Sequence, residues 1–441
     1  MDLTQIFIQK EQQVFKGKLS RVLSVAMLAL LLTLVSGCSV NPVTGEKQLS
    51  LISENEELAL GAEQYTPTQQ TQGGRFYIDP ELTVYVREVG QKLARVSDRP
   101  DLPYEFVVLN SSVPNAWALP GGKIAINRGL LVQLEDEAQL ASVLGHEIVH
   151  AAARHSVQRM QQGMLINAGV AGLGLALSDN SWANLIMGGA AVGAQLALAQ
   201  YSQGDELESD AYGIRYMKKA GYDPQAAVEL QELFLKMSQG RQAGWLDGLF
   251  ATHPPSAKRV NENQSLVQKV GAGGYRGQEV YQKRLARLKA LAPAYEAHDK
   301  AMELASKGEF AEALKAVDSA IEMEPREAMF YALRGRILRE QKQLDKAQAD
   351  FDKAVSLYPE MFTYQLYSGL NHLAMNNLDK ARSHLEQANQ VVPTSIAYLR
   401  LGDIARQQGQ RSNAVAYYSR AAEAGGDIGA EAQRKLAEMT K

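Results

Sequence analysis

Two histidines and a glutamate within five consecutive positions are the residues of this chain best suited to chemistry. His146, Glu147 and His150 form the pattern HExxH. On a helix, side chains four positions apart lie on the same face, so the two imidazoles can bind one metal ion with Glu147 beside it. Apolar residues recur with helical periodicity from 135 to 160, which predicts that helix. The pattern is typical of a zinc-dependent peptide hydrolase.

A third ligand is needed, because a catalytic zinc usually has three protein ligands and a fourth position for water. One class of metalloprotease takes it from the same helix, in the pattern HExxHxxGxxH. Ala153 and Ser156 occupy the Gly and the last His position of that pattern, which excludes this class. His155 lies nine residues after His146, about half a turn away at about 100° per residue. We therefore expect His155 to face away from the metal, as a structural or surface histidine.

A carboxylate from a second helix is the remaining option for the third ligand. The acidic run from 205 to 213 predicts a helix that begins near Asp205 and ends before Gly221. Glu206 and Asp210 are four positions apart and share a face of that helix. Glu206 could bind the metal while Asp210 accepts the second N–H of a ligand imidazole, and Glu208 points elsewhere.

With these residues, the chain resembles the CAAX-prenyl-protease-like zinc metallopeptidases of the HtpX and BepA kind. That family pairs HExxH with a downstream ExxxD, whose glutamate is the third zinc ligand. Residues 115–122 (NAWALPGG) and 252–256 (THPPS), followed by Arg259, also carry the resemblance, which spans roughly residues 40–265. It implies a gluzincin-type domain that binds one zinc ion through His146, His150 and Glu206.

The expected mechanism follows from these residue types. Zinc lowers the pKa of bound water towards about 7, and Glu147 takes the water proton and delivers it to the leaving amine. After the Gly121-Gly122 turn, a segment alternates like a strand, and it consists of Lys123, Ile124, Ala125, Ile126 and Asn127. In such enzymes an edge strand there pairs with an extended substrate, with little sequence preference. We therefore expect unfolded or loop segments of polypeptides as substrates.

His253 has two alternative roles at such a site. This histidine lies in a loop bounded by prolines. It could stabilise the oxyanion as a catalytic residue, or it could bind the metal as a fourth ligand and keep the enzyme latent.

The first 37 residues have the layout of a bacterial lipoprotein signal peptide. Basic residues precede an apolar run from Val22 to Val35, which is short of the roughly 20 residues of a spanning helix. The sequence Val35-Ser36-Gly37-Cys38 resembles a lipobox, in which Cys38 is lipidated. Cys38 is also the one cysteine of the chain. We expect a periplasmic protein whose lipid anchors it to the outer membrane, because Ser39 differs from the aspartate of an inner-membrane retention signal.

A repeat with a period of 34 residues occupies the C-terminal third. Alanines recur at 313, 347 and 381, and prolines recur at 325, 359 and 393. This period, with small residues at helix crossings and Pro closing each unit, resembles tetratricopeptide repeats. We predict four helix pairs from about Ala294 to Gly426 and a capping helix to Lys441, with a concave face that binds a protein partner.

Between Arg159 and Asp205 the chain contains a single charged residue and two apolar pieces, 164–177 and 182–199. Both pieces are short for a membrane span. We favour a helical hairpin that covers or gates the cleft over a hairpin inserted in the membrane, because no basic residues flank it.

The chain as a whole is predicted to be mainly α with a small β-sheet. It has 46 basic and 49 acidic residues, which argues against binding of nucleic acid. The expected parts are the signal peptide (1–37), a metalloprotease domain (38–269), a linker (270–293) and an α-solenoid of repeats (294–441). Within the protease domain we expect helices at 53–65 and 79–96 and a strand at 104–109.

Three functions fit these features. The first is a zinc endopeptidase that cleaves unfolded or misassembled envelope proteins recruited by the repeats. The second is a repeat-based scaffold or chaperone for envelope protein assembly, with latent or minor proteolysis. The third is an integral intramembrane protease.

Overall fold

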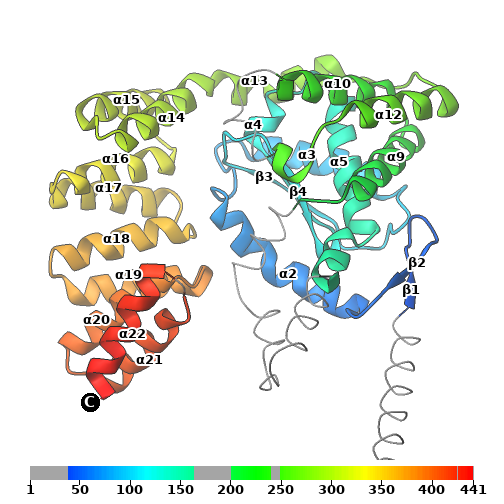
Figure 1. Ribbon diagram of the computed structural model, residues 1–441. Helices are drawn as coiled ribbons and strands as arrows, with labels where there is room; N and C mark the ends of the chain where they lie inside the picture. The colour runs from blue at the N-terminus through cyan, green and yellow to red at the C-terminus, as the bar shows by residue number, and fades with distance from the viewer. Residues whose placement is uncertain (1–37, 163–199, 240–248, 425, 441) are drawn as a thin grey trace, which may run out of the picture.

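The computed structural model describes residues 38–162, 200–239, 249–424 and 426–440 (Figure 1). The predicted signal peptide and the predicted hairpin between 164 and 199 lie outside these residues. Helices predominate in the described part, and the strands form two small sheets, so the predicted fold class is confirmed. Within these ranges, no helix is both long enough and apolar enough to cross a membrane.

The first two helices of the protease domain begin where the sequence predicts. Helix α2 (Glu54–Thr71) starts at a capping box, in which Ser53 accepts the Glu56 N–H and the Glu56 carboxylate accepts the Ser53 N–H. It continues beyond the predicted end at 65. Helix α3 (Pro80–Ala94) follows Asp79, but the Asp79 side chain makes no capping hydrogen bond. Pro80 instead favours the start of α3 by fixing φ in its first turn.

The larger sheet has three strands in the order β3-β5-β4. Strand β5 (Lys123–Asn127) pairs in parallel with β3 (Glu105–Leu109) and antiparallel with β4 (Ala116–Leu119). The expectation that β5 is an edge strand is therefore wrong, because both its edges are already paired. The sequence does not predict this pairing, because β4 lies between β3 and β5 in the chain while β5 lies between β3 and β4 in the sheet. Strands β1 (Cys38–Val40) and β2 (Lys47–Leu49) form a separate hairpin.

Helix α5 (Glu137–Ala152) carries HExxH through the centre of the protease domain. Asp136 begins it by accepting the N–H of Gln139 at 2.8 Å. Figure 1 shows α5 among α3, β4, α9 and α10, and it contacts all four. The helix is shorter than predicted, because Arg154 adopts a left-handed conformation with φ 63°. The Arg154 guanidinium holds that conformation through the Ile52 carbonyl at 2.6 Å and Glu57 at 2.8 Å.

The remaining helices of this part cover α5 and lead to the repeats. Helix α9 begins at the cap residue Ser202 and ends before Gly221, whose φ is 83°. The helices are α9 (Gln203–Lys219), α10 (Gln225–Gln239), α12 (Ala257–Val270) and α13 (Gln278–Ala290). Helix α13 lies in the predicted linker, but Tyr281 and Leu285 bury its apolar side in the main core. The linker is thus packed on the protease part.

The described C-terminal residues form the four predicted helix pairs and a final helix. The helices are α14 (Ala292–Ser306), α15 (Phe310–Met323), α16 (Ala328–Glu340), α17 (Leu344–Leu357), α18 (Phe362–Ala374), α19 (Leu378–Val391), α20 (Ser395–Gln407), α21 (Arg411–Ala422) and α22 (Gly426–Thr440). Within a pair the helices approach closely at glycine: a Cβ on Gly369 would lie 2.8 Å from Leu385. The 34-residue period therefore encodes these crossings.

Buried polar contacts fix the repeats to the protease part. The Glu327 carboxylate, which has no exposed surface, accepts hydrogen bonds from Tyr295 at 2.7 Å and Asn110 at 2.9 Å. The Arg128 side chain donates to Asn110 at 2.8 Å, and its guanidinium lies 3.4 Å from the Tyr295 ring centre. The first repeats are therefore held against the sheet side of the protease part by a satisfied polar network.

Candidate metal centre

A close crossing of α5 and α9 brings the candidate ligands together. Gly145 and Gly213 face each other there, and a Cβ on Gly213 would lie 3.1 Å from the backbone nitrogen of His146. The absence of side chains at these two positions lets the helix backbones approach closely. About two turns before Gly213, the short distance between the helix axes allows the carboxylate of Glu206 on α9 to reach His146 and His150 on α5.

Four side chains place possible ligand atoms within 4.8 Å of one another, namely His146, His150, Glu206 and His253. Nε2 of His146 lies 3.0 Å from Nε2 of His150 and 3.3 Å from Nδ1 of His253. Oε1 of Glu206 lies 3.2 Å from Nε2 of His150 and 3.0 Å from Nδ1 of His253. The predicted third ligand is thus within reach of a point between the two imidazoles.

These separations fit one zinc ion. In a tetrahedral site with bonds of about 2.0–2.1 Å, neighbouring ligand atoms lie about 3.3 Å apart. The four contacts above are 3.0 to 3.3 Å long. Imidazole nitrogens with one carboxylate oxygen are also a donor set that zinc accepts readily. The residues therefore fit the metal in both spacing and chemistry.

Asp210 and Arg259 orient the ligands from outside. Nδ1 of His146 lies 2.9 Å from Oδ1 of Asp210, which is the contact that the sequence suggested. Arg259 on α12 donates to both oxygens of Asp210 at 2.7 Å and lies 2.6 Å from Oε2 of Glu206. Since Arg259 engages Oε2, it leaves Oε1 of Glu206 for the metal.

His155 lies against the site, contrary to the sequence-based expectation. Its Nδ1 is 2.9 Å from Nδ1 of His150, and 2% of the residue is exposed. The expectation that it faces away assumed a continuous helix, but the left-handed Arg154 turns the chain back towards α5. Tyr201 was also missed: its ring stacks on the His150 ring with centres 3.6 Å apart. Neither contact has a signal in sequence spacing.

Burial and neighbouring charges set the charge states of the metal-free cluster. Burial holds the pKa of His150 well below 6.5, so its ring is neutral and offers a lone pair. Burial also opposes ionisation of Glu206, but attraction to His253 and His146 outweighs it, and the pKa of Glu206 lies well below 4.5. For His146, burial is likewise outweighed, and Glu206 and Asp210 raise its pKa to about 10.

Glu147 lies beside the cluster with one oxygen available. Its Oε1 is 3.6 Å from Nε2 of His253, while its Oε2 has no hydrogen-bond partner among the described residues. Burial raises the pKa of Glu147 above 4.5. A carboxylate whose pKa is shifted towards neutrality is better suited to taking up and returning a proton.

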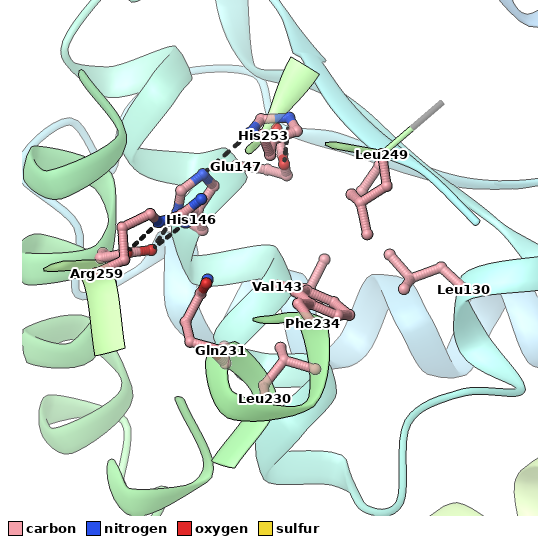
Figure 2. A pocket seen from close by; sticks show the side chains of 13 residues that line it. Leu130, Val143, His146, Glu147, Leu230, Gln231, Phe234, Leu249, His253 and Arg259 are labelled. Atoms are coloured by element: carbon pink, nitrogen blue, oxygen red, sulfur yellow. Dashed lines mark hydrogen bonds and ion pairs between the residues drawn. The ribbon is translucent and has the colours of Figure 1, made fainter. Parts of the chain in front are cut away.

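A small pocket with a free volume of about 30 Å³ opens beside these residues. Figure 2 shows His146, Glu147, His253 and Arg259 on one side of it. Apolar side chains form the other side, and they are Leu130, Val143, Leu230, Phe234 and Leu249. An apolar wall therefore lies next to the metal site.

The predicted substrate strand lies away from this opening. Lys123 at the start of β5 forms an ion pair with Glu105 and is 6% exposed. The edge of the sheet nearest the site is β4, whose Ala116 lines the pocket. The carbonyl of Ala118 on the same strand already accepts a hydrogen bond from Ser156 at 3.2 Å.

Comparison with known families assigns both parts of the chain. Residues 80–267 match Peptidase family M48, and residues 298–361 and 368–428 match Tetratricopeptide repeat. The chain therefore contains an M48 peptidase domain followed by tetratricopeptide repeats. The M48 match includes HExxH, Glu206, Asp210, His253 and Arg259, so the metal centre lies entirely within it.

The chain is similar to two groups of curated proteins. The beta-barrel assembly-enhancing protease of Yersinia pestis is 28% identical over 235 residues, which are 52% of this chain and 47% of that protein. The mitochondrial metalloendopeptidase OMA1 of Schizosaccharomyces pombe is 30% identical over 224 residues, which are 50% of this chain and 64% of that protein. The chain spans about half the length of the first of these relatives.

Solved structures match parts of this chain at low similarity. The crystal structure of MamA is 19% identical, with a TM-score of 0.29, and it covers 36% of this chain and 88% of that one. The assignment of the repeats therefore depends on the family match and on the helix pairs.

Proposed function

We propose that this protein is a zinc-dependent endopeptidase of the bacterial periplasm. The observation that carries the proposal is the convergence of His146, His150 and Glu206 at zinc spacing, with the buried Glu147 beside them. A zinc ion held there would polarise a peptide carbonyl and activate water at neutral pH.

The chain's own residues then have distinct roles. His146, His150 and Glu206 bind the ion, and Asp210 holds His146 in one orientation. Glu147, whose Oε2 has no hydrogen-bond partner among the described residues, would take a proton from the attacking water and return it to the leaving amine. His253 can donate from Nε2, which faces Glu147, to a carbonyl oxygen that develops negative charge.

Polypeptides with an apolar residue beside the cleaved bond are the proposed substrates. The apolar side of the pocket, which includes Val143 and Phe234, supports this preference. We further propose that the natural substrates are unfolded or misassembled envelope proteins. The printed name of the Yersinia pestis relative, a beta-barrel assembly-enhancing protease, supports this class.

The location and the partners are part of the same proposal. We infer that a signal peptide (1–37) is removed, that Cys38 carries a lipid, and that the protein is anchored to the outer membrane. The repeats from 294 to 441 would bind clients or an assembly partner on their concave face. The test is mass spectrometry of the N-terminal peptide from membranes: a mature chain that starts elsewhere than at Cys38, or lacks a lipid, refutes the anchor.

A second function, a scaffold with latent proteolysis, is favoured by one specific contact. Nδ1 of His253 lies as close to the cluster as the other ligand atoms, at 3.0 Å from Glu206. As a fourth ligand it would occupy the position that water needs. In this state the repeats would bind partner proteins while the metal centre does not cleave peptide bonds.

Cleavage assays with matched variants separate the two functions. We expect purified protein to contain about one zinc per chain and to cleave casein, and a chelator to stop cleavage. Glu147→Gln should abolish cleavage and keep the zinc. His253→Ala should raise cleavage if His253 blocks the metal and lower it if His253 stabilises the oxyanion. Folded, wild-type protein that binds no zinc would refute the endopeptidase.

A further inference from the structure

The two histidine ligands have different outer partners. His146 turns its second nitrogen to the carboxylate of Asp210, as metal-bound histidines commonly do. His150 turns its second nitrogen to another histidine, His155, at 2.9 Å. Both His150 and His155 are almost entirely buried.

The hydrogen positions in this pair follow from what metal binding requires. A zinc ligand must present a lone pair, so a ligand His150 that uses Nε2 is neutral and has its proton on Nδ1. That N–H needs an acceptor, and Nδ1 of His155 faces it. His155 can accept there only when its own proton is on Nε2.

The other nitrogen of His155 faces acceptors on α9. Its Nε2 lies 3.4 Å from Oε1 of Glu208 and 3.8 Å from Oδ1 of Asp205. These carboxylates favour the tautomer of His155 that has its proton on Nε2. The same tautomer makes Nδ1 an acceptor for His150, so the contacts on both sides of the ring agree.

The chain of contacts continues to the N-terminal hairpin. Oε1 of Glu208 also accepts the side-chain N–H of Asn41 at 3.0 Å. Asn41 follows β1 directly, and its side-chain oxygen accepts the N–H of Val43 at 2.8 Å in the turn before β2. Asn41 therefore has a fixed position, and it joins the hairpin after the proposed lipid site to α9.

We propose that His155 is a positioning residue for the metal centre. It fixes the tautomer and the ring orientation of His150, and Glu208 and Asn41 fix His155 in turn. The N-terminal hairpin is thereby connected to the metal ligands through three consecutive side-chain contacts. The proposal rests on zinc binding as proposed above.

The test compares two replacements of similar size at His155. His155→Gln keeps an oxygen acceptor, whereas His155→Leu keeps the volume without any acceptor. The readout is the zinc dissociation constant, measured by competition with a chromophoric chelator, with circular dichroism to compare folding. We expect His155→Leu to weaken zinc binding about 10- to 100-fold and His155→Gln to restore much of it.

Two further variants complete the design. Asn41→Ala should weaken zinc binding less than His155→Leu, because Asn41 is three contacts away from the ligand His150 and His155 touches it directly. His298→Ala is the matched control: His298 is a buried histidine of α14 with a contact to Asp299, and its loss should leave the zinc affinity unchanged.

The outcomes separate this inference from the proposed function. If wild-type protein binds zinc and His155→Leu binds it equally well, the positioning role is refuted and the endopeptidase proposal is untouched. Equal weakening by His155→Leu and His155→Gln also refutes it, because packing alone would then explain the loss. If wild-type protein binds no zinc, both proposals fail.

Discussion

Replacement of Arg259 by Gln would measure how much its positive charge stabilises the two carboxylates of the metal centre. The Arg259 guanidinium contacts the carboxylates of Glu206 and Asp210 at 2.6 to 2.7 Å. Arg259 is 3% exposed, and these two carboxylates have pKa values below their usual range, so both are ionised. Arg259→Gln removes the permanent positive charge between two buried negative charges.

The size of the effect follows from burial. Loss of one partner of a buried ion pair costs about 3 to 5 kcal/mol, because the remaining charge is left uncompensated. For a domain of 150 to 250 residues, about 1 kcal/mol shifts the melting midpoint by about 2 to 4 °C. We therefore expect the metal-free variant to melt about 6 to 20 °C below the metal-free wild type. Bound zinc supplies positive charge at Glu206, so the decrease in the melting midpoint should be smaller when zinc is bound.

Thermal unfolding followed by circular dichroism, with chelator and with excess zinc, measures both losses. Arg326→Gln is the matched control: Arg326 pairs with Glu324, but its side chain is 62% exposed, and we expect no change in the melting midpoint. If metal-free Arg259→Gln and metal-free wild type have the same melting midpoint, Arg259 does not stabilise the two carboxylates as argued. Equal losses with and without zinc would mean that Arg259 acts through packing and not through charge.

Three further predictions follow from the same structure. The carboxylates raise the pKa of His146 to about 10, so in metal-free protein at pH 7 the His146 ring is protonated, and zinc binding should release about one proton. Titration calorimetry in buffers of different ionisation enthalpy measures the number of protons released. Zinc binding without proton release would contradict the assignment of His146 as a ligand. Burial raises the pKa of Glu327 above 4.5, so the folded state binds its proton more tightly than the unfolded state. The stability from this group is complete below about pH 4.5 and decreases as the pH rises through the folded-state pKa; urea unfolding of Glu327→Gln across this range should lack that decrease. Gly369→Ala should destabilise the repeats by about 1 to 3 kcal/mol, since its Cβ would lie 2.8 Å from Leu385, and an unchanged urea midpoint would contradict the close crossing.

The sequence predicted the local elements well, because their signals are local. The capping box at Ser53 and the periodicity of α9 depend on neighbouring residues, and both helices begin close to the expected positions. The helix through HExxH ended early, since the left-handed Arg154 is held by Glu57 and Ile52, about a hundred positions away in sequence. The strand order also depends on distant pairing, which the alternation in Lys123–Asn127 does not encode.

The sequence by itself determined which residues could bind the metal and where the repeats begin, because i, i+4 spacing and a 34-residue period are properties of one helix or one repeat. Only the tertiary structure decided that Gly145 and Gly213 bring α5 and α9 into contact, that Arg259 compensates two carboxylates, and that His155 faces His150. These features depend on distances between elements, and such distances are set by packing of the whole chain rather than by any local pattern.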